Sequence, residues 1–128
     1  MRNAEFGITM SGPDLKLRTK SFALRVLKLV DAVPKSTTGR AMGSQIVRSA
    51  TSVAANYRAA CRARSAAEFL SKMGAVEEEA DETLFWLELI EEAGLVPPKR
   101  LAAIKKEADE LVAVTIASIK TARKNRAP

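Results

Sequence analysis

A chain of 128 residues, 47% apolar and 28% charged, is long enough for one globular domain with a buried core and too apolar for a disordered protein. It contains no histidine and a single cysteine, which excludes Ser-His-Asp and Cys-His catalysis, the common zinc sites and an internal disulfide framework. The net charge of +6 is uneven, because residues 1–64 carry 12 Lys and Arg against 3 Asp and Glu, whereas residues 65–128 carry 9 against 12.

The basic N-terminal half has two explanations. Such a half attracts polyanions, above all nucleic acid, but it can also pack against the acidic half and be partly neutralised there. Neither nucleotide-binding fingerprint is present, no apolar run approaches the ~20 residues that span a bilayer, and residues 1–13 have no signal-peptide pattern. We therefore expect a cytoplasmic protein without membrane contact, cofactor, metal or catalytic activity.

The first predicted helix begins near Asp14, which suits an N-cap, and ends at Val33, just before Pro34. Residues 1–13 are expected to form a flexible tail, and the helical domain to occupy residues 14–120. At about 100° per residue, the core-facing positions of the first helix gather on one side. They are Leu15, Thr19, Phe22, Val26, Leu29, Val30 and Val33.

The second helix is predicted to begin after the capping oxygens of residues 36–38 and to reach about Arg64. Its segment 44–64 contains four arginines and no acidic residue. One side carries the predicted core residues Ile46, Ala50, Val53, Ala54, Tyr57 and Cys61, the last as an inert buried thiol. The other side carries Arg48, Arg58 and Arg62 beside the small residues Thr51, Ser52, Ala55 and Ala59.

Two hypotheses account for this basic face. A nucleic-acid backbone can lie on the strip of small residues while guanidinium groups bind its phosphates; the residues that would do so are Arg48, Arg58, Arg62 and Arg64. Alternatively, the face is solvated, or its arginines pair with carboxylates of another helix or subunit. The sequence leaves both hypotheses open.

Ser65 and Glu68 have the spacing of a capping box and mark either a new helix or a bend. The third helix is predicted over 66–93, ended by Gly94, and Pro97 and Pro98 suit the first turn of a fourth helix. Residues 121–128 are expected to form a mobile basic tail. Four amphipathic helices joined by short loops predict an all-α protein, an antiparallel up-down-up-down four-helix bundle.

The third helix carries two further features. Its acidic run, residues 77–82, spreads around the helix and is interpreted as a solvated face rather than a metal site. Phe85, Trp86 and Leu89 lie away from the core stripe, and large apolar side chains of this kind are enriched at interfaces. We therefore predict an oligomer interface at these three residues. The alternative is a third helix that is buried on two sides.

The chain resembles the bacterial four-helix bundle proteins named for intervening sequences in 23S ribosomal RNA genes. The resemblance covers roughly residues 14–120 and rests on Gln45 and Ser49, on Ser52, Val53 and Asn56, and on Ser65 with Glu68 and Phe69. It implies a ring-like homopentamer and kinship with the accessory proteins of diversity-generating retroelements, which are basic pentameric bundles that bind nucleic acid. It implies no catalytic activity. Where many relatives have an acidic residue and a glycine, this chain has Ala59 and Ala60, which makes the second helix more basic.

The leading functional hypothesis is a non-enzymatic, oligomeric bundle that binds RNA or DNA backbone with little sequence preference. The alternative is a protein-interaction scaffold whose basic face receives an acidic protein. The two differ in whether purified protein retains nucleic acid.

Overall fold

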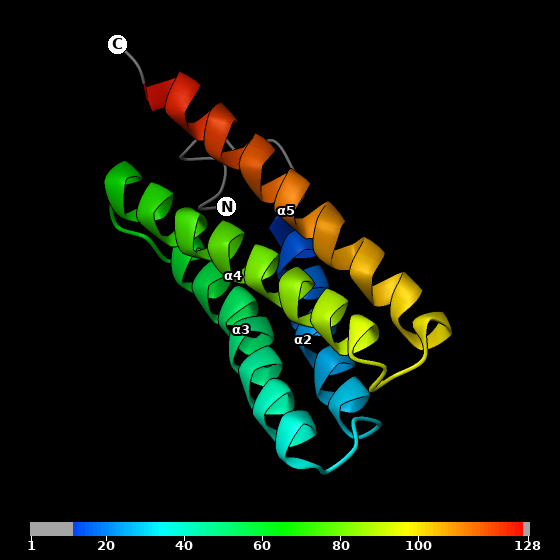
Figure 1. Ribbon diagram of the computed structural model, residues 1–128. Coiled ribbons are helices and arrows are strands. Elements are labelled where there is room, and N and C mark those ends of the chain that lie inside the picture. The colour runs from blue at the N-terminus through cyan, green and yellow to red at the C-terminus, as the bar shows by residue number, and fades with distance from the viewer. Residues whose placement is uncertain (1–11, 127–128) are drawn as a thin grey trace.

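The computed structural model of the protein describes residues 12–126, so the segments 1–11 and 127–128 of the expected tails lie outside the described residues. Four helices follow one another along the chain: α2 (Gly12–Val30), α3 (Thr37–Cys61), α4 (Ala66–Glu92) and α5 (Pro98–Arg126). Consecutive helices run in alternating directions and pack side by side, with no strand in the described part (Figure 1). The predicted all-α four-helix bundle is confirmed.

Local signals in the sequence fix three helix ends, namely the starts of α3 and α4 and the end of α4. The hydroxyl of Ser36 accepts a hydrogen bond from the amide of Gly39 at 3.0 Å, and that of Ser65 accepts one from the amide of Glu68 at 3.0 Å. Each serine therefore caps a helix N-terminus, and Ser65 begins a new helix rather than a bend. After α4, Gly94 adopts a positive φ of 72°, the left-handed conformation that ends helices at glycine.

The core consists of the apolar stripes that the sequence predicts. Phe22, Val26, Tyr57, Phe69 and Leu111 have no or almost no exposed surface. On α3, however, Ala54 and Cys61 are only half-buried, because both lie at the edge of the buried stripe.

Two helix ends differ from the expectation. α2 ends at Val30, since Pro34 prevents the residue before it from taking helical angles; three tighter turns follow, and Val33 still reaches the core. At the other end, α5 continues past residue 120 to Arg126, and Ala122 is buried. Its last turns extend the bundle where a mobile tail was expected, because the apolar stripe of α5 continues through Ala122.

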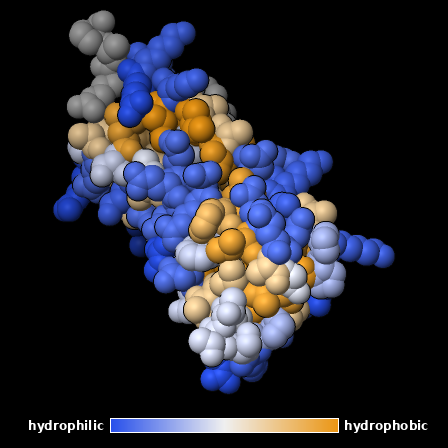
Figure 2. All heavy atoms as spheres, viewed as in Figure 1, coloured by the Kyte–Doolittle hydropathy of each residue, from blue (hydrophilic) through white to orange (hydrophobic). Residues whose placement is uncertain are grey.

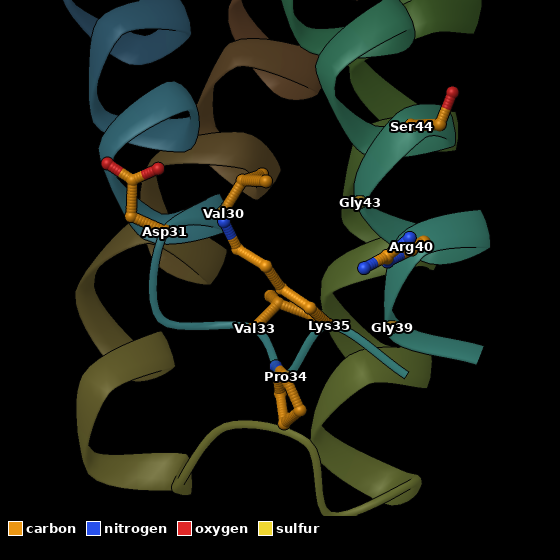
Figure 3. A pocket seen from close by; sticks show the side chains of 9 residues that line it. All are labelled: Val30, Asp31, Val33, Pro34, Lys35, Gly39, Arg40, Gly43 and Ser44. Carbon is orange, nitrogen blue, oxygen red and sulfur yellow. The ribbon is translucent and has the colours of Figure 1, made fainter. Parts of the chain in front are cut away.

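The turn between α2 and α3 encloses a shallow pocket of about 410 Å³ (Figure 3). Gly39 approaches the carbonyl of Pro34 so closely that a β-carbon would collide with backbone atoms, and Gly43 leaves space beside Val30. The pocket is thus a consequence of two missing side chains where the chain folds back. Its wall combines Asp31 with basic side chains of the turn, so its charge is mixed.

We expect Gly39→Ala to lower the free energy of unfolding by about 1–3 kcal/mol, because the Pro34 backbone cannot move aside for a methyl group. The matched control is Gly74→Ala in the middle of α4, where a β-carbon would meet no atom within 4 Å. It should raise the free energy of unfolding by about 1 kcal/mol, since alanine restricts the unfolded chain more than glycine. Urea denaturation checks both, and equal effects of the two variants would contradict the close approach.

Candidate nucleic-acid interface

A basic groove runs between α2 and α3. It has a volume of about 410 Å³ and is lined by Lys16 and Lys20 from α2, by Ala54, Ala55 and Arg58 from α3, and by Arg62, which caps the C-terminus of α3. The four charged side chains are exposed, and no carboxylate of residues 15–125 lines the groove. A concave surface lined by positive charges concentrates the positive electrostatic potential and favours an anionic ligand.

Helix periodicity explains how the sequence builds this groove. Lys16 and Lys20 are four residues apart on α2 and lie on one face of that helix. Arg58 belongs to the last turn of α3 and Arg62 caps this helix, and both line the groove. The alanines of α3 supply a low floor between the two rows. The like-charged lysine pair opposes the stability of α2 by about 0.2–0.5 kcal/mol, whereas the helix dipole favours cations at the C-terminal end of α3.

Among residues 15–125, no carboxylate pairs with the four cations of the groove. In residues 15–125, the ion pairs of the bundle involve other basic residues, namely Arg18, Arg48 and Lys105. The side chains of Lys16, Lys20, Arg58 and Arg62 are therefore exposed to solvent and make no ion pair in this range. Of the two alternatives that the sequence leaves open, pairing with a carboxylate of another helix does not apply to Arg58 and Arg62 within residues 15–125.

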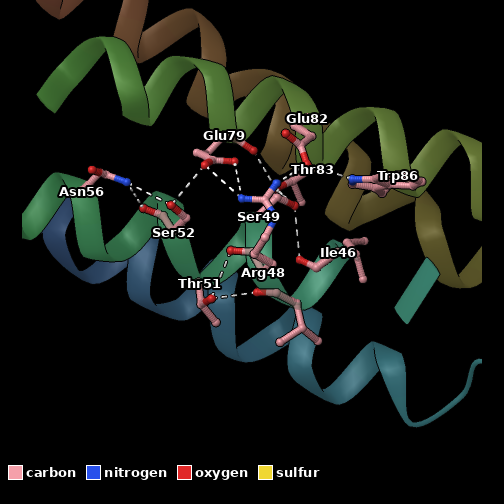
Figure 4. Close-up of polar contacts among 11 residues, drawn as sticks. Ile46, Arg48, Ser49, Thr51, Ser52, Asn56, Glu79, Glu82, Thr83 and Trp86 are labelled. Atoms are coloured by element: carbon pink, nitrogen blue, oxygen red, sulfur yellow. Dashed lines mark hydrogen bonds and ion pairs between the residues drawn. The ribbon is translucent and has the colours of Figure 1, made fainter. Parts of the chain in front are cut away.

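Arg48 is in a different situation, on the flank of α3 that faces α4 (Figure 4). Its guanidinium donates to Glu79, with a shortest contact of 3.1 Å, and to Glu82. These hydrogen bonds, that with Glu79 first, raise the pKa of Arg48. The structure thus separates Arg48 from the groove and gives it two carboxylate partners on the neighbouring helix.

The carboxylates that hold Arg48 belong to a larger polar cluster between α3 and α4. Ser52 donates to Glu79 at 3.3 Å, and the side-chain amide of Asn56 donates to the Ser52 hydroxyl at 2.9 Å. Closer to the core, the hydroxyls of Ser49 and Thr83 are hydrogen-bonded at 2.8 Å. The acidic run of α4 therefore contributes Glu79 and Glu82 to an interhelical contact, where the sequence analysis expected a solvated face.

The sequence indicates Arg58 and Arg62 but does not identify the lysines that face them. The structure adds Lys16 and Lys20 of α2 to these arginines. Their spacing of four residues was a usable signal, but the choice of face required knowing which flank of α2 meets α3. Arg64 is exposed in the loop after α3, two residues beyond the groove.

The predicted interface residues differ in exposure. The side chain of Phe85 is 51% exposed, whereas Trp86 and Leu89 are half-buried and pack against the core. The Phe85 and Trp86 rings meet edge to face with centroids 5.0 Å apart. Figure 2 shows apolar side chains reaching the surface between charged ones on the face that carries α4 and α5.

The described residues offer little to other chemistry. They contain no group of three or more His, Cys, Asp or Glu side chains placed to hold a metal ion. None of the four described helices has the length and hydrophobicity that crossing a membrane requires.

Comparison with known proteins decides the family. The model of a family described as 23S rRNA-intervening sequence protein matches residues 14–117. The chain belongs to this family. A similar solved structure is the crystal structure of a protein with unknown function from the S23 ribosomal protein family of Bacteroides thetaiotaomicron. It is 32% identical, with a TM-score of 0.80, over 87% of this chain and 99% of that one. A comparison with curated proteins finds no match.

In this family member, several of the residues that carry the resemblance make contacts within the bundle. Ser49, Ser52 and Asn56 form the polar cluster between α3 and α4, and Ser65 caps α4. Family membership therefore accounts for the fold and for contacts between its helices. The basic groove depends on other residues, namely Lys16, Lys20, Arg58 and Arg62.

The contact between Trp86 and Glu82 yields a pH-dependent prediction. The indole N–H donates to Glu82 at 3.1 Å, and this hydrogen bond, followed by that from Arg48, holds the pKa of Glu82 below its usual value of 4.5. A lowered pKa means that the charged carboxylate stabilises the folded state at neutral pH. This contribution is lost as the pH falls below 4.5 and through the pKa of the folded state.

We expect the fluorescence of Trp86, the single tryptophan, to change in that acid range while circular dichroism still reports helix. Glu82→Gln should abolish the transition. Glu78→Gln, one helical turn before Glu82 and without contact to the indole, should preserve it. An unchanged transition in Glu82→Gln would show that another group titrates.

Proposed function

We propose that this protein is a non-enzymatic, oligomeric four-helix bundle that binds the backbone of RNA or DNA through the basic groove between α2 and α3. The observation that carries the proposal is the alignment of four cations along one groove, with no ion pair to them and no carboxylate in the groove wall among residues 15–125. Phosphates are the ligands that guanidinium and ammonium groups bind in such an array. Arg64, exposed just beyond the groove, extends its positive charge.

The same geometry argues for weak sequence preference. Sequence is read at base edges, whereas stacking on exposed aromatic rings binds unpaired bases of any sequence. The single tyrosine, Tyr57, is fully buried, and no aromatic side chain of residues 15–125 lines the groove. Contacts are thus limited to charge and shape, which position a nucleic acid without reading it.

Binding of this kind should depend steeply on salt, because each neutralised phosphate releases counterions. We expect the slope of log affinity against log salt to decrease in magnitude by about 2 in the double variant Lys20→Ser, Arg58→Ser, since each lost contact to duplex removes ~0.9. Fluorescence anisotropy with a labelled oligonucleotide, between 50 and 200 mM salt, measures the slope.

The matched control is the double variant Lys99→Ser, Lys106→Ser on α5, which removes the same charge from exposed positions outside the groove. It should keep the slope of the wild type, and Arg48→Ser should change it less than Arg58→Ser because Arg48 is already paired. If the slope changes equally in both double variants, binding depends on the net charge of the protein rather than on the groove.

A second candidate is a protein-interaction scaffold, which the exposed apolar side chains favour. Leu17 is 67% exposed, Leu24 58% and Phe85 51%. Under this alternative the basic groove receives an acidic protein, and purified protein carries no nucleic acid by its absorbance ratio at 260 and 280 nm.

A further inference from the structure

The outer face of α4 is acidic around one exposed ring. Phe85 is flanked by Glu78, Asp81, Glu88 and Glu92, which stand seven and four residues before it and three and seven after it, and so share its side of the helix. Among residues 15–125, none of these four carboxylates makes an ion pair. We call this surface the acidic face; Leu89, half-buried one turn beyond Phe85, extends its apolar centre.

Between α2 and α5, apolar side chains are surrounded by positive instead of negative charges. A shallow pocket of about 220 Å³ has Leu29, Ala103 and Ile104 as its apolar part and Arg25, Lys28 and Arg100 as its charged part. These three cations likewise have no partner within the described bundle. We call it the cationic pocket. It exists because α2 and α5 pack less closely than the other adjacent helices.

We propose that the acidic face of one copy docks on the cationic pocket of a second copy, with Phe85 seated on Leu29 and Ile104 and the carboxylates around it paired with Arg25, Lys28 and Arg100. Both surfaces combine an apolar centre with a charged surround, and the charges are of opposite sign. Aromatic residues and arginine are the types that dominate interface energetics. Charge complementarity of this kind fixes the partner and its orientation.

The contact is heterologous, because it joins two different surfaces of the same chain. Every copy then offers one free acidic face and one free cationic pocket, so the assembly repeats until it closes as a ring or extends as a filament. The inference deepens the oligomeric part of the proposed function and does not depend on nucleic-acid binding. The basic groove lies on the other flank of α2, toward α3, and is lined by different cations.

The occupant is a second copy rather than an unrelated protein because the complementary surface is present on the chain itself. Leu24 is exposed and lies one helical turn before Lys28 on α2, so it would add an apolar side chain to the contact area. Nucleic acid is the other candidate occupant. Its phosphate backbone would make no complementary contact with the apolar part of the pocket, and the acidic face would repel it.

Complementation between two variants tests the proposal. Phe85→Glu disables the acidic face and keeps the pocket, whereas Lys28→Glu with Arg100→Glu disables the pocket and keeps the face. Light scattering at micromolar concentration should give an assembly for the wild type and a single chain of 13.8 kDa for each variant alone. Their mixture should form a species of two chains and nothing larger, because after one contact only disabled surfaces remain.

The control is Lys16→Glu with Lys20→Glu, an equal charge reversal in the basic groove, which should leave the assembly intact. Circular dichroism confirms that each variant is folded. A monomeric wild type, a variant that assembles alone, or a mixture that stays monomeric would each overturn the proposal. So would a pocket variant that loses oligonucleotide binding but keeps the wild-type mass, because the pocket would then belong to the nucleic-acid surface. If the monomeric variants still bind oligonucleotide, assembly and nucleic-acid binding use different surfaces, and each proposal can fail without the other.

Discussion

The two carboxylates of α4 that hold the guanidinium of Arg48 determine how charge is distributed over the bundle. Glu79 and Glu82 reach the α4-facing flank of α3, where they also bind Ser52 and Trp86. No acidic residue of the described chain lines the basic groove on the other flank, which faces α2. The arginines of one helix therefore have two roles: Arg48 joins helices, whereas the others remain charged toward solvent.

The same division recurs on α2. On its α5 side, Arg18 makes a bidentate contact with Glu107, at 2.7 and 3.0 Å, which links the two least closely packed neighbours. Hydrogen bonds and charge from Glu107 raise the pKa of Arg18. On the α3 side, Lys16 and Lys20 have no such partner. The paired cations Arg18, Arg48 and Lys105 lie at contacts between helices, whereas the cations that line the basic groove and the cationic pocket make no ion pair in residues 15–125. The groove and the pocket, rather than the helix contacts, are therefore the candidate binding surfaces.

Much of this fold could be predicted from the sequence because its signals are local. Pro34, Gly94 and Ser65 act on adjacent residues, and apolar periodicity identifies the buried side of each helix without knowledge of its neighbours. The groove could not be predicted in full, because it depends on which flank of α2 meets α3. For the same reason the pairing of Arg48 was open, since its partners are 31 and 34 residues away and are brought close only by the register of two helices.

The net charge of +6 implies repulsion between like charges, and the proposed contacts together would reduce it. Unpaired cations on both flanks of α2 repel one another, which opposes the compact state. Docking of the acidic face on the cationic pocket neutralises one flank and the carboxylates of α4 at once. The basic groove would then carry the main uncompensated charge of each copy. An assembled particle would present several identical grooves. If one strand reaches more than one of them, the particle would bind a polyanion more tightly than a single chain does.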